Sequence, residues 1–133
     1  MAALSARQNV FSGTSWEDAV GYSWAVRIGN RIVVSGTTAV DAGGKVASPG
    51  DAGGQTRSII DKIETGLAAC GGSLSDVART RIFLTDIDNW VSVGAAHQEA
   101  FGEIRPAATM VEVSRLIDPD LLVEIEVDAE LTA

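Results

Sequence analysis

The chain has 133 residues, of which 46% are hydrophobic and 21% charged, and this composition predicts one packed globular domain over residues 1–133. A single cysteine excludes an intrachain disulfide scaffold and favours a reducing, cytoplasmic location. The net charge of −8, with no cluster of basic residues to offset it, opposes binding to nucleic acid. No apolar run approaches the roughly 20 residues of a membrane span, so a membrane is not an expected partner either.

The first half of the chain begins with predicted strands. Residues 22–28 and 31–38 have the composition of strands and are joined by the two-residue hairpin turn Gly29-Asn30. A further short strand near residues 8–11 stays open as an option. Residues 41–54 contain five glycines and are therefore expected to form a loop.

A helix is predicted over residues 55–70, because apolar side chains recur along one of its faces. They are Ile60, Ile63, Leu67 and Cys70. Asp51 or Thr56 is expected to cap the start of this helix, and Gly71-Gly72 to end it. Since Cys70 belongs to the apolar stripe, we interpret it as a core residue and not as a nucleophile.

The second half of the chain is predicted to contain three strands and one helix. A helix capped by Asp86 or Asp88 is expected to run to about Phe101. Arg105-Pro106 ends that unit, because the residue before a proline avoids the α region. The strands are predicted at residues 77–84, 107–114 and 122–131, the last two being joined by a turn at residues 118–120.

The last predicted strand has the clearest pattern in the sequence. Acidic and apolar residues alternate along it: Val123, Glu124, Ile125, Glu126, Val127, Asp128, Ala129, Glu130 and Leu131. This period of two sends the carboxylates to one face of the strand and the apolar groups to the other. We interpret Glu126, Asp128 and Glu130 as solvent-facing, whereas Glu124, close to the preceding turn, is the candidate site carboxylate.

The order of the elements predicts an α+β fold, with one sheet of about six strands and two helices packed on one face. No phosphate-binding loop, dinucleotide glycine motif or Cys-x-x-Cys pair is present, so no cofactor is expected. His97 is the only histidine, which excludes a histidine-based metal cluster. We interpret His97 as a partly buried helix side chain that shares a face with Trp90, Gly94 and Phe101.

Five segments that together span most of the chain carry a further pattern. They are residues 12–17 (Ser-Gly-Thr-Ser-Trp-Glu), 20–23 (Val-Gly-Tyr-Ser), 33–38 (Val-Val-Ser-Gly-Thr-Thr), 105–113 (Arg-Pro-Ala-Ala-Thr-Met-Val-Glu-Val) and 122–126 (Leu-Val-Glu-Ile-Glu). In this order they resemble the Rid family, also called YjgF or endoribonuclease L-PSP. The resemblance implies a chorismate-mutase-like fold of the bacillus type, a homotrimer, and small-molecule clefts between its subunits.

The best-known members of the family deaminate reactive 2-imino and enamine acids. By this resemblance, Tyr22 and Ser35 match substrate-binding residues, and Glu124 matches the catalytic glutamate that positions water. The family's arginine, which clamps the substrate carboxylate, is replaced by Ala108, and the cysteine that follows it in many members is replaced by Met110. The remaining cleft positions implied by the resemblance are Trp90, Gly94 and Thr109.

Arg105 lies three residues before Ala108 and is the nearest cation along the chain. An odd spacing on a strand places two side chains on opposite faces, and Pro106 intervenes, so Arg105 is expected to be a poor substitute. The chain therefore resembles a divergent subgroup that lacks the deaminase arginine. A cleft lined by Ala108 and Met110 is expected to favour a neutral or weakly polar small molecule.

Three hypotheses about function remain open at this point. The first is a hydrolase or deaminase acting on a C=N bond, with Glu124 as the catalytic residue. The second is a non-catalytic metabolite-binding protein that uses the same clefts. The third is the endoribonuclease of the family's older name, which the net charge opposes. Standard 2-iminobutanoate/2-iminopropanoate deaminase activity is not expected, because Ala108 stands where the arginine would be.

Overall fold

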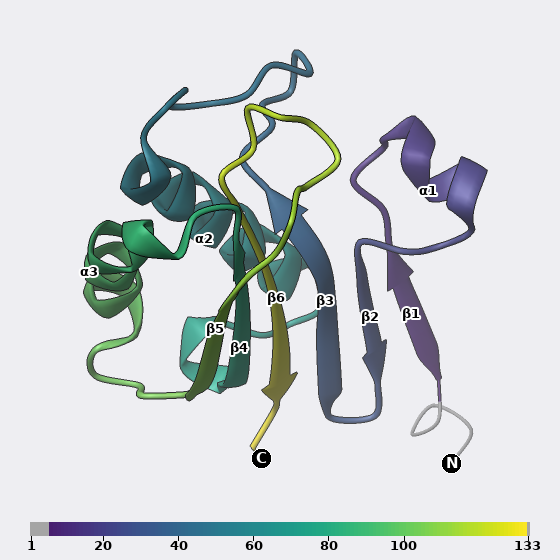
Figure 1. Cartoon of the computed structure of the whole chain (residues 1–133). Helices are drawn as coiled ribbons and strands as arrows, with labels where there is room; N and C mark the ends of the chain where they lie inside the picture. Colours follow the sequence, from purple (N-terminus) through teal and green to yellow (C-terminus); the bar gives the residue numbers. More distant parts are fainter. Residues whose placement is uncertain (1–5, 133) are drawn as a thin grey trace.

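The computed structural model describes residues 6–132, which form one mixed sheet of six strands in the order β1-β2-β3-β6-β4-β5 (Figure 1). The strands are β1 (Arg7–Val10), β2 (Ala25–Ile28), β3 (Arg31–Thr38), β4 (Val77–Leu84), β5 (Ala107–Glu112) and β6 (Val123–Glu130). Neighbouring strands are antiparallel except for β4 and β5, which run parallel. The predicted sequence of these strands along the chain is confirmed, and β1 corresponds to the optional first strand near residues 8–11.

Two long helices, α2 (Ala52–Ala69) and α3 (Trp90–Phe101), lie together on one face of the sheet (Figure 1). The predicted α+β arrangement is therefore confirmed. Helix α2 begins at Ala52, three residues before the predicted start, because the Asp51 carboxylate caps it by accepting a hydrogen bond from Gly54 N at 2.9 Å. Gly53 belongs to the helix and not to the predicted loop. It lets α3 pack closely, because a Cβ at Gly53 would come within 3.3 Å of Ser92 O.

Two short 3₁₀ turns, η2 (Leu74–Asp76) and η3 (Ile87–Asn89), precede β4 and α3 respectively. Asp86 caps η3 by accepting from Asp88 N at 2.9 Å. The prediction that Asp86 or Asp88 caps the long helix is wrong, because α3 begins after Asn89, which makes no side-chain cap. In the described part of the chain, no helix has the length and apolar character that crossing a membrane requires.

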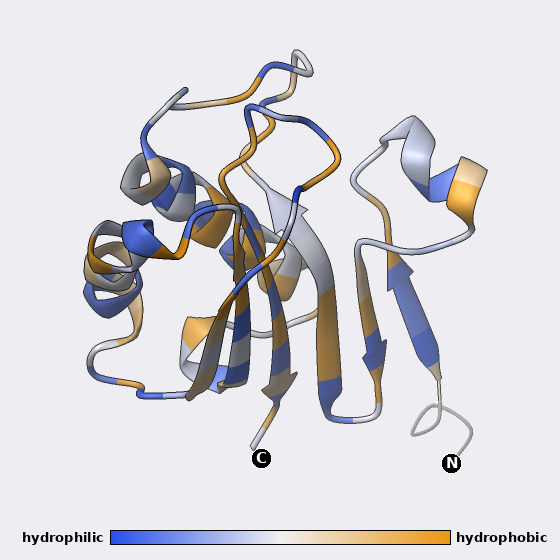
Figure 2. Ribbon diagram, in the orientation of Figure 1, coloured by the Kyte–Doolittle hydropathy of each residue, from blue (hydrophilic) through white to orange (hydrophobic). Residues whose placement is uncertain are grey.

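The core lies between the helical layer and the sheet. The apolar residues of β6 face it and are almost completely buried: Val123, Ile125, Val127 and Ala129. The stripe of α2 packs against the same core with Ile59, Ile60, Ile63, Leu67 and Cys70. Orange and blue bands alternate along the strands in Figure 2, as expected for a sheet with one covered face. Burial raises the pKa of the Cys70 thiol, and the nearby Arg27 lowers it by less.

The other face of the sheet carries charged side chains and is not covered by α2 or α3 (Figure 1). Arg81 on β4 reaches two carboxylates of β6, with its Nη1 atom 3.5 Å from both Glu126 Oε1 and Asp128 Oδ2. Arg31 on β3 lies 4.0 Å from Asp128. We call this surface the open face of the sheet.

A short helix, α1 (Ser15–Val20), was not predicted and lies near the ends of β1 and β2, away from the helical layer (Figure 1). Its Glu17 side chain is only 4% exposed and accepts hydrogen bonds from Ser12 N, Ser12 Oγ and Gly13 N at 3.0, 2.6 and 3.1 Å. The helix ends at Gly21, whose φ of 88° is in the left-handed region that glycine adopts readily. Tyr22 N then donates to Glu17 O at 3.1 Å, so α1 fixes the backbone of Tyr22.

Candidate functional site

The first group of candidate residues lies where β3 ends and β6 begins. Glu124 is half-buried on the open face of β6, between Thr38 of β3 and Phe83 of β4. Ser35 Oγ donates to Ser23 O at 2.7 Å, which connects β3 to the residue that follows Tyr22. We call Glu124, Ser35, Gly36 and Tyr22 the Glu124 half-site, to which Tyr22 is assigned only through its neighbour Ser23.

Gly36 makes room for the catalytic candidate. The pairing of β3 with β6 slips by one residue between Val34 and Thr37, which is a β-bulge. Gly36 lies in this bulge, and a Cβ atom there would overlap Oε2 of Glu124. Gly36 is not among the predicted site residues, although a glycine inside a strand pattern is a known signal for a bulge or a close approach.

The environment of Glu124 changes its titration. Burial raises the pKa of its carboxyl group, and the neighbouring Glu126 carboxylate raises it further. We find no hydrogen bond to the Glu124 carboxylate from any residue between 6 and 132. Its oxygens are therefore available to accept a proton or to orient a water molecule.

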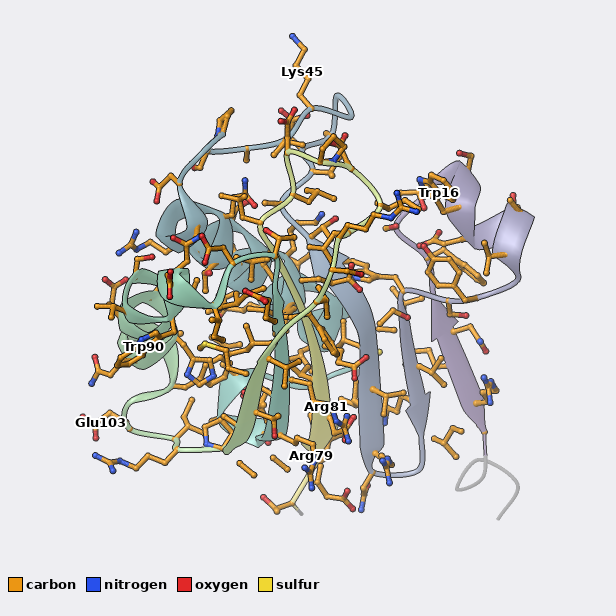
Figure 3. The ribbon with its side chains drawn as sticks, in the orientation of Figure 1. Trp16, Lys45, Arg79, Arg81, Trp90 and Glu103 are labelled. Atoms are coloured by element: carbon orange, nitrogen blue, oxygen red, sulfur yellow. The ribbon has the colours of Figure 1, made fainter. Side chains whose placement is uncertain are left out.

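The second group lies on the helical side of the sheet. Trp90 and Gly94 share one face of α3 with His97. Trp90, the first residue of this helix, is 58% exposed (Figure 3). Apart from the backbone of its own helix, no atom of residues 6–132 lies within 4 Å of the place where a Cβ of Gly94 would be. Ala108 of β5 pairs with Thr80 of β4, and Thr80 Oγ1 is 3.0 Å from His97 Nε2. We call Trp90, Gly94, His97 and Ala108 the α3 half-site.

The two other predicted cleft residues of β5 lie on different faces of that strand. Met110, two residues after Ala108, is half-buried and packs against the core. Thr109 lies opposite Arg81, on the open face, where Figure 3 shows Arg79 and Arg81 over the strands. Thr109 therefore does not belong to the α3 half-site.

The sheet separates the two half-sites. On β4, Phe83 pairs with Glu124, whereas Thr80 pairs with Ala108. These two β4 residues are three apart, so they face opposite sides of the sheet. Thr80 is completely buried beneath α3, and Glu124 is on the open face. Within one chain, Glu124 and Ala108 therefore do not meet.

A cavity of about 340 Å³ lies at the C-terminal end of α3. It is lined by His97, Gln98, Phe101, Gly102, Arg105 and Pro106. Strand alternation does not apply to Arg105, contrary to the premise of the prediction, because β5 begins only at Ala107 and Arg105 has a φ of 55°. Arg105 instead shares a cavity with His97, which lies over the Thr80–Ala108 pair.

His97 is half-buried, as expected, and its ring centroid lies 4.7 Å from that of Phe101. Burial lowers the pKa of His97, which favours the neutral imidazole. Among the residues that the structure describes, no group of three or more His, Cys, Asp or Glu side chains is arranged to hold a metal ion.

The strand order and the two helices on one face define the chorismate-mutase-like class of α+β folds. The family model for endoribonuclease L-PSP matches residues 13–131, and the chain therefore belongs to this family, which is also called Rid or YjgF. A RutC family protein from Pyrococcus abyssi is 34% identical over 121 residues, covering 91% of this chain and 94% of the relative.

Two further comparisons extend this likeness. A protein from Acinetobacter baylyi named 3-aminoacrylate deaminase RutC is 38% identical over 104 residues, covering 78% of this chain and 82% of its own length. The crystal structure of a Mycobacterium tuberculosis member of the YjgF/YER057c/UK114 family is 50% identical, with a TM-score of 0.86 over 95% of this chain and 100% of that one.

Proposed function

We propose that this chain is a small-molecule-binding member of the Rid family, whose ligand clefts lie between the subunits of a cytoplasmic homotrimer. The observation that carries the proposal is the separation of the Glu124 half-site from the α3 half-site by the sheet. A second copy that brings its α3 half-site to Glu124 completes a cleft that one chain lacks. The open face is compatible with such an interface, because Arg81 already pairs with two of its half-buried carboxylates and a paired charge costs less to bury than an unpaired one.

In this cleft we propose that Glu124 acts on a C=N bond or on the enamine from which it forms. The carboxylate takes a proton from water as the water oxygen bonds to the carbon of the C=N group, and it passes this proton to the nitrogen. The carbinolamine that results gives its O–H proton back through Glu124 to the nitrogen, so that the C=O bond forms as the C–N bond breaks and the nitrogen leaves as ammonia or an amine. The raised pKa of Glu124 makes its carboxylate a stronger base than that of an ordinary glutamate, which supports this role. The name of the Acinetobacter baylyi relative, a 3-aminoacrylate deaminase, supports this reaction class.

The group next to Ala108 is proposed to be neutral, because no cation stands at that position. A standard 2-imino acid carries its carboxylate on the reacting carbon and would lose a charge-assisted contact of roughly 1.5–3 kcal/mol there. A non-catalytic metabolite-binding role is the alternative, and the replacement by Ala108 favours it. The endoribonuclease hypothesis is the weakest, because the net charge is −8 and Arg81 on the open face is already paired.

The test compares Glu124→Gln with Glu130→Gln, a matched control on the same face of β6 at its exposed end. Imines are generated from amines by an amine oxidase, and in a second arm from amino acids by an amino-acid oxidase, with semicarbazide trapping as the readout. We expect acceleration in the first arm, lost by about 10²- to 10⁴-fold in Glu124→Gln and retained in Glu130→Gln.

Three outcomes would contradict parts of this proposal. Equal rates for both variants would remove the catalytic role of Glu124 and favour the non-catalytic alternative. Acceleration confined to the amino-acid arm would contradict the neutral group next to Ala108. A sedimentation measurement that gives only the 13.8 kDa chain would contradict the cleft between subunits.

A further inference from the structure

We infer that the cavity at the C-terminal end of α3 is an anion subsite, in which Arg105 binds a carboxylate group of the ligand in place of residue 108. This inference rests on the proposed function in one respect, which is that the reacting carbon of the ligand lies next to Ala108. The cavity itself is built by one chain, from the last turn of α3 and the segment that leads into β5.

The backbone holds the Arg105 side chain in a defined position. Its φ of 55° lies in the left-handed region, which a residue with a side chain rarely adopts. Arg105 N donates to Phe101 O at 2.8 Å, and Arg105 Nε donates to Gly102 O at 3.2 Å. Both terminal Nη groups have no hydrogen-bond or ion-pair partner among residues 6–132. A guanidinium anchored through Nε keeps the two donors that a carboxylate needs.

The other walls of the cavity suit an organic acid. Phe101 and Pro106 provide apolar surface, while the Gln98 amide and the His97 ring are polar. The His97 ring is held between Thr80 Oγ1 and the Phe101 ring. A Cβ at Gly102 would come within 2.6 Å of Gln98 Nε2, so this glycine allows the amide to lie against the end of the helix.

The end of a helix normally disfavours an anion, because its last carbonyl groups carry partial negative charge. At the end of α3, the last carbonyl oxygens already accept hydrogen bonds from backbone N–H groups. Gln98 O accepts from Gly102 N at 2.8 Å, and Phe101 O accepts from Ile104 N at 3.0 Å as well as from Arg105 N. The cavity therefore presents one full positive charge and few free carbonyl oxygens.

The position of Arg105 selects the class of ligand. It precedes Ala108 by three residues, which span at most about 10 Å of extended chain. A ligand that places a neutral carbon next to Ala108 and a carboxylate on Arg105 has the two groups separated by further atoms. We therefore expect an enamine or imine whose carboxylate is not attached to the carbon that water attacks. Only the part of the ligand that lies next to Ala108 is therefore expected to be neutral, and not the whole ligand.

The single histidine gives a direct test in the full-length protein, because His97 yields the only imidazole resonance from the native sequence in an NMR spectrum. Butyrate is titrated against butyramide, a neutral molecule of the same shape. We expect butyrate to shift the His97 resonance with an affinity about 10- to 100-fold higher than that of butyramide. Arg105→Gln should abolish this difference, and Arg57→Gln, which removes an exposed arginine paired with Glu99, should leave it.

Arg105→Gly separates binding from folding. Glycine accepts a φ of 55° without strain, so this variant should unfold at the same or a higher denaturant concentration and still lose the preference for butyrate. Equal affinities for butyrate and butyramide would overturn the role of charge, and the absence of any His97 response would overturn the subsite. If the Glu124→Gln variant still binds butyrate, or if the native protein binds butyrate but has no hydrolase activity, the subsite is supported. Only the catalytic proposal would then be contradicted by a lack of hydrolase activity.

Discussion

The Glu124 half-site and the α3 half-site are built in opposite ways. In the first, an irregular backbone holds a chemical group: the β-bulge at Ser35-Gly36 brings the main chain against the Glu124 carboxylate. In the second, small residues leave space, because Gly94 has no side chain and the exposed Ala108 has only a methyl group. One sheet thus holds a reactive carboxylate on one face and a place for a ligand on the other. The association of two copies of the chain would bring the carboxylate of one copy to the ligand site of the other.

The two glycines make this difference measurable. Neither Gly36 nor Gly94 has a positive φ, so alanine is compatible with the backbone at both positions. The surroundings differ completely, because a Cβ would overlap a carboxylate at Gly36 and meet nothing within 4 Å at Gly94. Replacing each glycine by alanine therefore adds the same methyl group to a filled place at Gly36 and to an open place at Gly94.

The largest effect is expected for Gly36→Ala. The new methyl group forces the Glu124 carboxylate out of its position, because the backbone of the bulge is held by Ser35 N and Ser35 Oγ. We expect the loss of any hydrolase activity to match that of Glu124→Gln, with about 1–3 kcal/mol of lost stability from overpacking. Activity assays and urea unfolding measure the two effects. Full activity in a folded variant would show that Glu124 is not held as the structure has it.

The next effect concerns the helix that fixes Tyr22 in the Glu124 half-site. Glu17→Gln removes a charged acceptor from two backbone N–H groups and one hydroxyl, and we expect a loss of about 2 kcal/mol in the free energy of unfolding. Asp18→Asn, an exposed change in the same turn, is the matched control. Equal unfolding midpoints for the two variants would contradict the role of Glu17.

The pH dependence of this effect has a definite sign. Burial raises the pKa of Glu17, but the hydrogen bonds from Ser12 and Gly13 outweigh it, so the pKa of the folded state is below 4.5. The stabilisation is then fully present above the pKa of the unfolded chain and is lost as the pH falls through the folded value. The difference between the native protein and Glu17→Gln should be constant near neutral pH and shrink below about pH 4.5.

Much of the fold was predictable because hydrophobic periodicity determines it directly. The alternation along β6 and the apolar stripe of α2 each identify an element and its buried face. Helix α1 was missed although Thr14 and Glu17 have the spacing of a capping box. In the structure Thr14 makes no side-chain cap, and Glu17 instead accepts hydrogen bonds from Ser12 and Gly13. The capping-box spacing therefore marks the start of the helix but does not give the hydrogen-bond partners of these residues.

The candidate site was less predictable, because its geometry depends on contacts between segments far apart in the chain. Strand alternation was applied to Arg105, which lies outside the strand in a left-handed conformation that no periodicity indicates. His97 was interpreted from its own helix, but its contact with Thr80 depends on how α3 packs against β4. The face on which Glu124 lies was nevertheless clear, since the period of β6 alone determines it.

The smallest effect, and the sharpest test of the open half-site, is Gly94→Ala. Alanine inside a helix is more favourable than glycine by about 0.5–1 kcal/mol, and no described atom opposes the new methyl group. We therefore expect a small rise in stability in thermal or urea unfolding, opposite in sign to the effect of Gly36→Ala. Because the space above Gly94 is proposed to receive a ligand, butyramide affinity should fall in the same variant. A loss of stability that grows with protein concentration would instead show that a side chain of another copy fills this space, and the comparison would become one between two packed surfaces.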